Sequence, residues 1–260
     1  MTQPVPGIPA LRSDNALIIG DLHIGVEAHL MKKGVHLTSR TKDMLSTINA
    51  ASTEETDRII IIGDVKDSVP GSSFQEFQEI PKFFESLLEI YSSVEVVRGN
   101  HDTELERFLP SGVRVHPATG MVFNDLGLVH GHTWPSSRVM SRKTLVMGHE
   151  HPTILFKDGI GSTVSEPCWL RGSFRHDVPD TRYPALPDSF IVVPAFNRLL
   201  GGSPINTVGG ELLGPVLNSD LVDLDNAHIY LLDGLDLGRR SENMVSDTRI
   251  KKRRSEKTQI

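Results

Sequence analysis

The sequence lacks the features of several protein classes. It has one cysteine, Cys168, so an internal disulfide is excluded and we expect a reducing compartment, most simply the cytoplasm. The first 15 residues contain no apolar run long enough for a signal peptide, and no later run approaches the roughly 20 apolar residues of a membrane span. We therefore expect no association with a membrane.

The sequence also lacks a strong charge of either sign. Its formal net charge of -6 argues against a polybasic nucleic-acid binder and against an acidic solvating chain. Basic residues are concentrated at the end, where residues 239–260 hold eight Lys or Arg and three Asp or Glu. We expect an N-terminal extension over residues 1–15, one domain over residues 16–237 and a disordered basic tail over residues 238–260. The run Lys251–Arg254 either contacts nucleic acid or is simply solvated.

Short apolar runs that end in glycine or a polar residue predict buried strands. They lie at residues 16–20, 59–63, 94–99, 126–131, 144–148 and 190–195. Between the first two, Thr38 or Ser39 can begin a helix whose apolar face includes Met44, Leu45 and Ile48. The alternation of strands and helices in the first half, followed by strands and turns, predicts an α/β or α+β fold with stacked sheets.

A second helix is predicted after residue 72. Ser73 and Glu76 have the spacing of a capping box, in which each residue satisfies a backbone N–H of the other. Pro81 is expected to kink or divide this helix. The residues with core-facing spacing are Phe74, Phe77, Phe84, Leu87 and Leu88.

Most of the predicted strands lead into residues that can bind metal ions. The clusters are Asp21-Leu22-His23, Gly63-Asp64-Val65-Lys66-Asp67, Gly99-Asn100-His101-Asp102, His130-Gly131-His132 and Gly148-His149-Glu150-His151. Each cluster alone is weak, because a buried histidine is more often a hydrogen-bonded core residue than a ligand. Five clusters in order, at the carboxyl ends of strands where open α/β sheets form their sites, indicate a metal centre.

These clusters resemble the calcineurin-like metallophosphoesterases, whose pattern is DxH, GDxxD or GDxxH, GNHD or GNHE, a later histidine, and GHxH. The resemblance covers residues 16–151. It implies a four-layer αββα sandwich, in which helices flank two mixed β-sheets. The segments Val193–Asn197 and Trp169–Gly172 are similar to the branch of archaeal SbcD-related and bacterial DNA-ligase-associated phosphoesterases.

The resemblance also implies two divalent metal ions per chain. One would be bound by Asp21, His23, Asp64 and His151, and the other by Asp64, Asn100, His130 and His149. Asp64 would bridge the two ions, because a carboxylate has two oxygens. Mixed oxygen and nitrogen ligands suit manganese, iron or zinc better than magnesium or calcium, without distinguishing among those three. We expect Mn²⁺, with iron or zinc as alternatives.

In the family, the histidine of the GNHD element is not a ligand. Here it is His101, which we expect to protonate the leaving group, with Asp102 orienting its ring and Asp67 as a supporting residue. His132 is a candidate for substrate contact or for a solvated loop position. Arg171 is a candidate for gripping phosphate, and ordinary surface pairing explains it equally well.

Together these features predict a phosphodiesterase that attacks nucleic acid or nucleotide-like diesters with a metal-bridging hydroxide. DNA or RNA would be its partner as substrate, and the sequence does not indicate whether it has a protein partner. A protein phosphatase is disfavoured, because Ser68 stands where the GDxVDRG element carries arginine. A phosphomonoesterase for small molecules and a catalytically silent scaffold stay open as alternatives.

Overall fold

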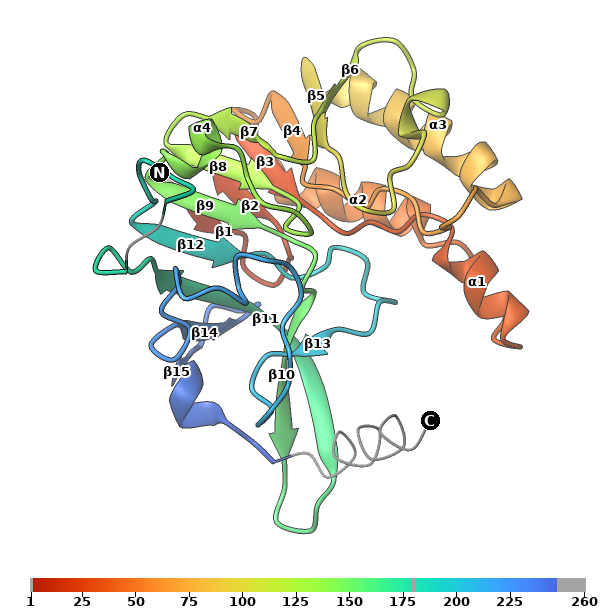
Figure 1. The fold of residues 1–260 in the computed structure, drawn as a ribbon. Helices are drawn as coiled ribbons and strands as arrows, with labels where there is room; N and C mark the ends of the chain where they lie inside the picture. Colours follow the sequence, from red (N-terminus) through yellow and green to blue (C-terminus); the bar gives the residue numbers. More distant parts are fainter. Residues whose placement is uncertain (1, 179–180, 247–260) are drawn as a thin grey trace.

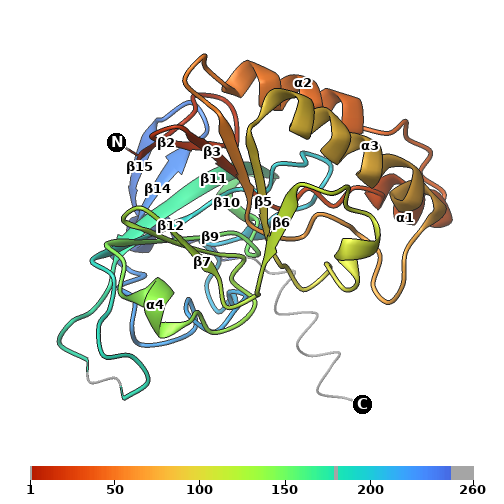
Figure 2. The same ribbon diagram turned by 90° about the horizontal axis from the view of Figure 1, so that it is seen from above.

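Two β-sheets lie face to face in the computed structural model, which describes residues 2–178 and 181–246 (Figures 1 and 2). The first sheet has the order β1-β2-β3-β4-β5-β6, in which β3 to β6 are parallel and β1 and β2 are antiparallel. Its central strands are mostly apolar because both faces are covered, with Glu95 of β5 as a buried charged exception. The strands are β1 (Thr2–Pro4), β2 (Leu11–Ser13), β3 (Ala16–Ile19), β4 (Arg58–Ile61), β5 (Ser93–Val97) and β6 (Val113–His116).

The second sheet has nine strands, of which β8, β9 and β12 are parallel and form its centre. The strands β10 and β11 form a long hairpin that extends away from the first sheet (Figure 1). The strands are β7 (Met121–Phe123), β8 (Leu126–Val129), β9 (Thr144–Met147), β10 (Pro152–Lys157), β11 (Thr163–Ser173), β12 (Ser189–Val192), β13 (Ser203–Pro204), β14 (His228–Leu231) and β15 (Asp236–Arg239).

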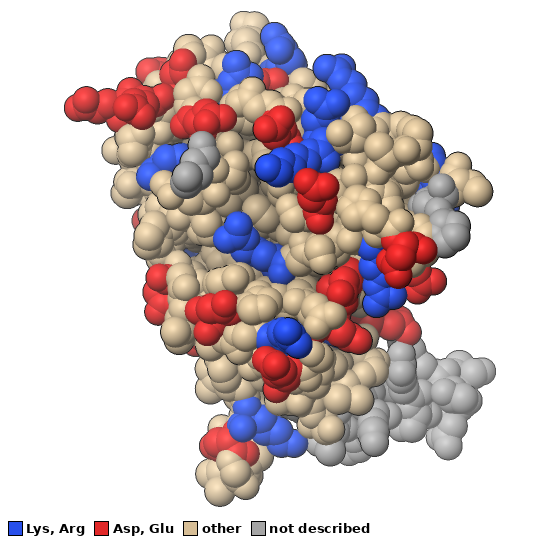
Figure 3. Space-filling model, turned by 90° about the vertical axis from the view of Figure 1, so that its left-hand side faces the viewer, with Lys and Arg blue, Asp and Glu red and all other residues tan. Residues whose placement is uncertain are grey.

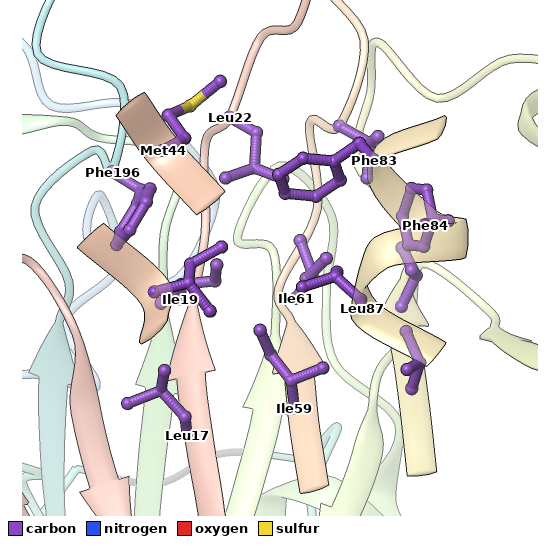
Figure 4. Close-up of a cluster of buried hydrophobic side chains, with 14 of the residues drawn as sticks. Leu17, Ile19, Leu22, Met44, Ile59, Ile61, Phe83, Phe84, Leu87 and Phe196 are labelled. Atoms are coloured by element: carbon purple, nitrogen blue, oxygen red, sulfur yellow. The ribbon is translucent and has the colours of Figure 1, made fainter. Parts of the chain in front are cut away.

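Helices cover the outer face of the first sheet. Ile59 and Ile61 of β4 pack against Phe83, Phe84 and Leu87 (Figure 4). The outer face of the second sheet is covered by a short helix and by long loops. The helices are α1 (Val26–Lys32), α2 (Thr41–Ala51), α3 (Phe74–Ile90) and α4 (Ser137–Met140), with 3₁₀ turns at Leu105–Arg107 and Arg240–Asn243.

A third apolar layer joins the two sheets. Ile18 and Ile60 of the first sheet meet Leu128, Val146 and Trp169 of the second. All six predicted strands are present within three residues of their expected limits. The mixed α/β class with two mixed sheets is therefore confirmed. Among the described residues, no helix combines the length and the apolar character needed to cross a membrane.

Helix α3 confirms one prediction and corrects another. The capping box is present: the Ser73 hydroxyl accepts from the Glu76 N–H, and the Glu76 carboxylate accepts from the Ser73 N–H. Phe74 and Phe77 are 78% and 53% exposed, so the expectation that both face the core is wrong. Phe77 instead contacts the ring of Phe108, with centroids 4.8 Å apart, because the first turns of α3 do not cover the sheet. The helix also runs undivided across Pro81.

The sheet extends beyond the expected domain limits. Residues 2–13, expected to be an extension, form β1 and β2 on the edge of β3. At the other end, β15 reaches Arg239 and a 3₁₀ turn follows to Asn243. Most of the predicted basic tail, including Lys251–Arg254, lies outside the described residues.

Candidate metal centre

Loops at the carboxyl ends of β3, β4, β5, β8 and β9 converge between the two sheets and carry the candidate ligands. Several of these ligands have left-handed backbone conformations, which turn the chain sharply after the strand. Their φ angles are 58° for Asp21, 41° for His23, 49° for Asp64, 68° for His149 and 46° for His151. Backbone hydrogen bonds join the first two loops, from Asp21 N to Gly63 O at 3.0 Å and from His23 N to Asp64 O at 2.9 Å.

One group of ligand atoms belongs to Asp21, His23 and His151 and lies within 4.8 Å. His151 Nε2 is 3.1 Å from Asp21 Oδ1. His23 Nε2 is buried and makes no hydrogen bond, although a buried polar atom is normally paired. These donors fit a divalent cation, which would give that nitrogen a partner.

A second group consists of Asp64, His130 and His149, also within 4.8 Å. His130 Nε2 is 3.3 Å from Asp64 Oδ2 and 3.0 Å from Asn100 Oδ1. His130 Nδ1 lies 3.0 Å from the Ile62 carbonyl oxygen, to which it donates. That bond directs Nε2 toward the other donors, as the outer hydrogen bond of a metal-binding histidine does.

Asp64 lies between the two groups. Its Oδ2 atom is 3.5 Å from His23 Nε2 and 3.3 Å from His130 Nε2, and it is 4.0 Å from His101 Nε2. Its Oδ1 atom accepts the His101 backbone N–H at 2.9 Å. The structure thus brings together all seven ligand candidates around the residue expected to bridge.

Two glycines make room for these ligands. A Cβ atom on Gly99 would lie 2.1 Å from Asp64 Oδ1, and one on Gly63 would lie 2.5 Å from His130 Nδ1. Gly63 also has a φ of 91°, which side-chain-bearing residues rarely adopt. These glycines are required by the close approach of ligand side chains to the backbone.

Opposite charges inside the site shift its pKa values. Burial alone would lower the pKa of His130, but Asp64 and Asp21 outweigh burial and raise that pKa to about 9. Burial and the neighbouring His130 lower the pKa of His149 to about 4. Burial would raise the pKa of Asp64, yet His130 and His23 lower it overall. The carboxylates are therefore ionised and ready to bind a cation.

His101 faces the centre and forms, with His23 and Asp64, a third group of possible ligand atoms within 4.8 Å, although it belongs to neither of the two expected ligand sets. Its Nδ1–H donates to the Asp67 carbonyl oxygen at 2.6 Å, so Nε2 is the atom on the side of Asp64. Its side chain is 29% exposed, which leaves Nε2 accessible to a substrate. The Asp67 carboxylate contacts His23 Nδ1 at 3.3 Å. Asp67 therefore supports both histidines, as expected of a supporting residue.

Asp102 has a different position from the expected one. Its fully buried carboxylate accepts the N–H groups of Val65 and Gly99 at 2.8 Å each and of Lys66 at 3.4 Å. Burial, with the nearby Asp64 charge, raises its pKa. Asp102 thus joins the loops after β4 and β5, and the contact that orients His101 comes from the Asp67 carbonyl. The expectation failed because the sequence does not show which backbone groups a buried carboxylate meets.

The two tentative substrate contacts lie in different places. The His132 ring is 5.2 Å from the His130 ring, and its Nδ1 atom is buried without a hydrogen bond. Burial, reinforced by His130, lowers its pKa. Arg171 lies over the Tyr230 ring, 5.7 Å from the centroid. The described ion pairs of Asp21 and Asp64 do not include Arg171, so the structure does not bring Arg171 together with the ligands.

Sequence reasoning missed three residues that support the site. The spacing of Ser73 and Glu76 predicts only a helix cap, yet the Glu76 Oε1 atom also accepts from the N–H groups of Asp67 and Ser68. Asn197 donates to the Leu22 carbonyl at 2.8 Å and so holds the first metal loop. Lys66 is buried within the GDxxD element. The polar sequence around Lys66 gives no local sign that this lysine is buried.

Comparisons with known proteins give one family and two solved structures. The family model described as calcineurin-like phosphoesterase matches residues 15–191. The nuclease MPE of Pseudomonas putida has a similar structure, with a TM-score of 0.51, 17% identity, and coverage of 89% of this chain and 96% of that chain. The phosphoesterase Yfce of E. coli gives a TM-score of 0.38 at 14% identity, over 86% of this chain and 97% of that one. No curated protein sequence matches the chain.

Proposed function

The chain belongs to the calcineurin-like phosphoesterases, a family of metal-dependent phosphoric ester hydrolases, and we propose that it is a phosphodiesterase acting on nucleic acid or nucleotide-like diesters with two divalent metal ions. The observation that carries this proposal is that Asp64 Oδ2 lies between a histidine of each expected ligand set, 3.5 Å from His23 Nε2 and 3.3 Å from His130 Nε2, with His101 Nε2 4.0 Å away. Mn²⁺ is the proposed ion, with iron or zinc as alternatives.

The chain's own residues divide the work. Asp21, His23 and His151 would hold one cation, His130, His149 and Asn100 the other, and Asp64 both. When bound, the ions supply positive charge for the phosphate and lower the pKa of a water molecule. His101 Nε2 would hold the proton that the leaving oxygen needs. The Asp67 carbonyl keeps that nitrogen on the side of Asp64.

The charges around the centre favour a diester. Within the described part of the chain, the ion pairs of Asp21 and Asp64 involve only histidines, with no lysine or arginine. A monoester carries nearly two negative charges and is usually gripped by a guanidinium, whereas a diester carries one. The described centre therefore suits the singly charged substrate better.

Exposed basic residues on the helix that follows the first ligand loop support a nucleic-acid substrate. Helix α1 begins three residues after His23 and projects from the body of the fold beside α3 (Figures 1 and 2). Lys32 and Lys33 are exposed at its end, and neither forms an ion pair with another described residue. The face in Figure 3 carries Lys and Arg interspersed with Asp and Glu instead. Unpaired lysines at the end of this helix could contact the phosphates of a polyanionic strand that extends beyond the centre.

The test is hydrolysis of bis-p-nitrophenyl phosphate and p-nitrophenyl phosphate, with added Mn²⁺ and after chelation. Wild type is compared with Asp64→Ala and with Asp233→Ala, which removes an exposed carboxylate on the β14–β15 turn. We expect Mn²⁺-dependent cleavage of the diester, lost in Asp64→Ala and retained in Asp233→Ala. Preferential cleavage of the monoester would favour the phosphomonoesterase. Metal binding without any cleavage would favour the scaffold.

A further inference from the structure

Lys66 is a lysine with almost no contact with solvent. The residue is 1% exposed and lies in the loop between β4 and α3. Its Nζ atom donates to the carbonyl oxygens of Ser68 at 2.7 Å and Gly71 at 2.6 Å, and approaches Ser72 Oγ at 3.5 Å. Burying an ammonium group is costly unless each of its donors is satisfied. The carbonyls of this one loop satisfy it.

Glu76 binds the same loop by accepting hydrogen bonds from backbone N–H groups of the loop. The residue is fully buried at the start of α3. Its Oε1 atom accepts from Asp67 N at 2.9 Å and Ser68 N at 2.7 Å, and its Oε2 atom accepts from Ser73 N. Residues 67–73 are here called the Asp67 loop. Lys66 binds carbonyl oxygens of this loop, and Glu76 binds its backbone N–H groups.

The Asp67 loop contacts the candidate proton donor directly. The Asp67 carbonyl is the group that His101 Nδ1 meets at 2.6 Å, while the Asp67 carboxylate contacts His23. The Asp67 carbonyl shares its peptide plane with the Ser68 N–H, which Glu76 binds. The peptide groups on either side are also held, by Glu76 at the Asp67 N–H and by Lys66 at the Ser68 carbonyl. The Asp67 carbonyl therefore cannot rotate freely. Because proton transfer depends steeply on distance and angle, rotation of this peptide would misplace His101 Nε2.

We propose that Lys66 and Glu76 are positioning residues, which fix the Asp67 loop so that its carbonyl aims His101 at the leaving group. The inference rests on the proposed function, because it takes His101 as the proton donor. Neither residue touches the substrate in this scheme. Each acts through the Asp67 peptide.

The proposal predicts a dependence on the leaving group that a general loss of structure would not produce. An alkoxide is a poor leaving group and needs a proton as its bond to phosphorus breaks, whereas p-nitrophenolate leaves as a stable anion. Misplacing His101 should therefore slow the hydrolysis of a dinucleotide, which has an alkoxide leaving group, far more than the hydrolysis of bis-p-nitrophenyl phosphate.

The experiment compares kcat on these two substrates for Lys66→Met, His101→Asn and the double variant, with the metal content of each measured. Lys66→Met removes the charge and keeps a long apolar side chain. We expect kcat on the dinucleotide to fall about 10- to 100-fold in Lys66→Met, a part of the typical contribution of an acid catalyst. On bis-p-nitrophenyl phosphate we expect kcat to fall by less than about threefold, with the metal content unchanged. The double variant should be no slower than His101→Asn alone.

Glu76→Gln keeps the volume of the side chain and tests the other half of the proposal, and it decides the matter if Lys66→Met does not fold. Lys82→Met and Glu85→Gln change exposed residues of α3 and should not change kcat on either substrate. Equal slowing of both substrates, or additive losses in the double variant, would overturn the positioning role. If His101→Asn itself shows no preference between leaving groups, the proposed proton donor is wrong instead.

Discussion

His130 Nε2 lies 3.3 Å from Asp64 Oδ2, and both side chains are almost completely buried. Despite the burial, the carboxylates of Asp64 and Asp21 raise the pKa of His130 to about 9. At neutral pH the imidazole is therefore protonated on Nε2 as well as on Nδ1, whereas a metal ligand must present a free nitrogen. Filling the centre must displace that proton.

The first prediction is that metal binding releases a proton and strengthens with pH. Between pH 7 and 9 we expect the affinity for Mn²⁺ to rise up to about tenfold per pH unit and to level off above pH 9, where His130 is neutral. Calorimetric titrations in buffers of different ionisation enthalpy count the protons released. Affinity that does not change over this range would contradict the assignment of His130 as a ligand.

A second prediction concerns Gly99. The Cβ atom of Gly99→Ala would lie 2.1 Å from Asp64 Oδ1, so the bridging carboxylate must move. We expect Mn²⁺ to bind about 10- to 100-fold more weakly, as when other supports of ligands are removed. Gly159→Ala is the matched control, because nothing lies within 4 Å of its added carbon. Equal metal content in the two variants would show that Asp64 tolerates displacement.

A third prediction concerns stability. A hydrogen bond from His116 to the buried Glu95, with the charge of Arg58, outweighs burial and lowers the pKa of Glu95 below its ordinary 4.5. The lowered pKa stabilises the fold above pH 4.5, and this contribution is lost as the pH falls through the folded-state value. At pH 7 we expect Glu95→Gln to reduce the free energy of unfolding by about 1–3 kcal/mol.

The difference between wild type and Glu95→Gln should narrow below pH 4.5, as measured by urea unfolding across a pH series. Glu89→Gln changes an exposed glutamate of α3 and should stay within about 0.5 kcal/mol of wild type. A difference that is constant from pH 3 to pH 7 would assign the effect to packing and not to the charge.

The fourth prediction concerns Lys32 and Lys33. If both contact phosphates, the double alanine variant should flatten the slope of log affinity for single-stranded DNA against log salt by about 1.4. Hydrolysis of bis-p-nitrophenyl phosphate should be unchanged, because that substrate does not reach α1. A double variant of Lys82 and Lys143, both exposed, controls for net charge. Identical slopes for the two double variants would exclude a role of α1 in binding the strand.

The strands and ligand candidates could be predicted because their signals are local. A strand buried on both faces is a short apolar run, as at Ile59–Ile61, and the polar residues that follow it lie at the carboxyl edge of the sheet. Glycine before Asp64 and before Asn100 marks the tight approach of the loops. Such patterns require no knowledge of distant partners.

What could not be predicted depends on contacts far apart in the sequence. The pairing of β1 and β2 with β3 extends the sheet to residues that carry little apolar periodicity. The spacing of Phe74 is correct for a core face, but the helix turn on which it lies has no sheet beneath it. Asp102 accepts from Val65, 37 residues away, a partner that motif spacing cannot reveal.

The left-handed backbone of the metal loops bears on whether this chain is a working enzyme. Each non-glycine residue in that conformation costs about 1 kcal/mol or more, and five of the candidate ligands adopt it. Glycine at any of these positions would relieve the strain and stabilise the metal-free fold, at the loss of a ligand. A chain that served only as a scaffold would gain from that exchange. This chain instead keeps aspartate and histidine where they weaken the fold, so its loops trade stability for the capacity to hold metal.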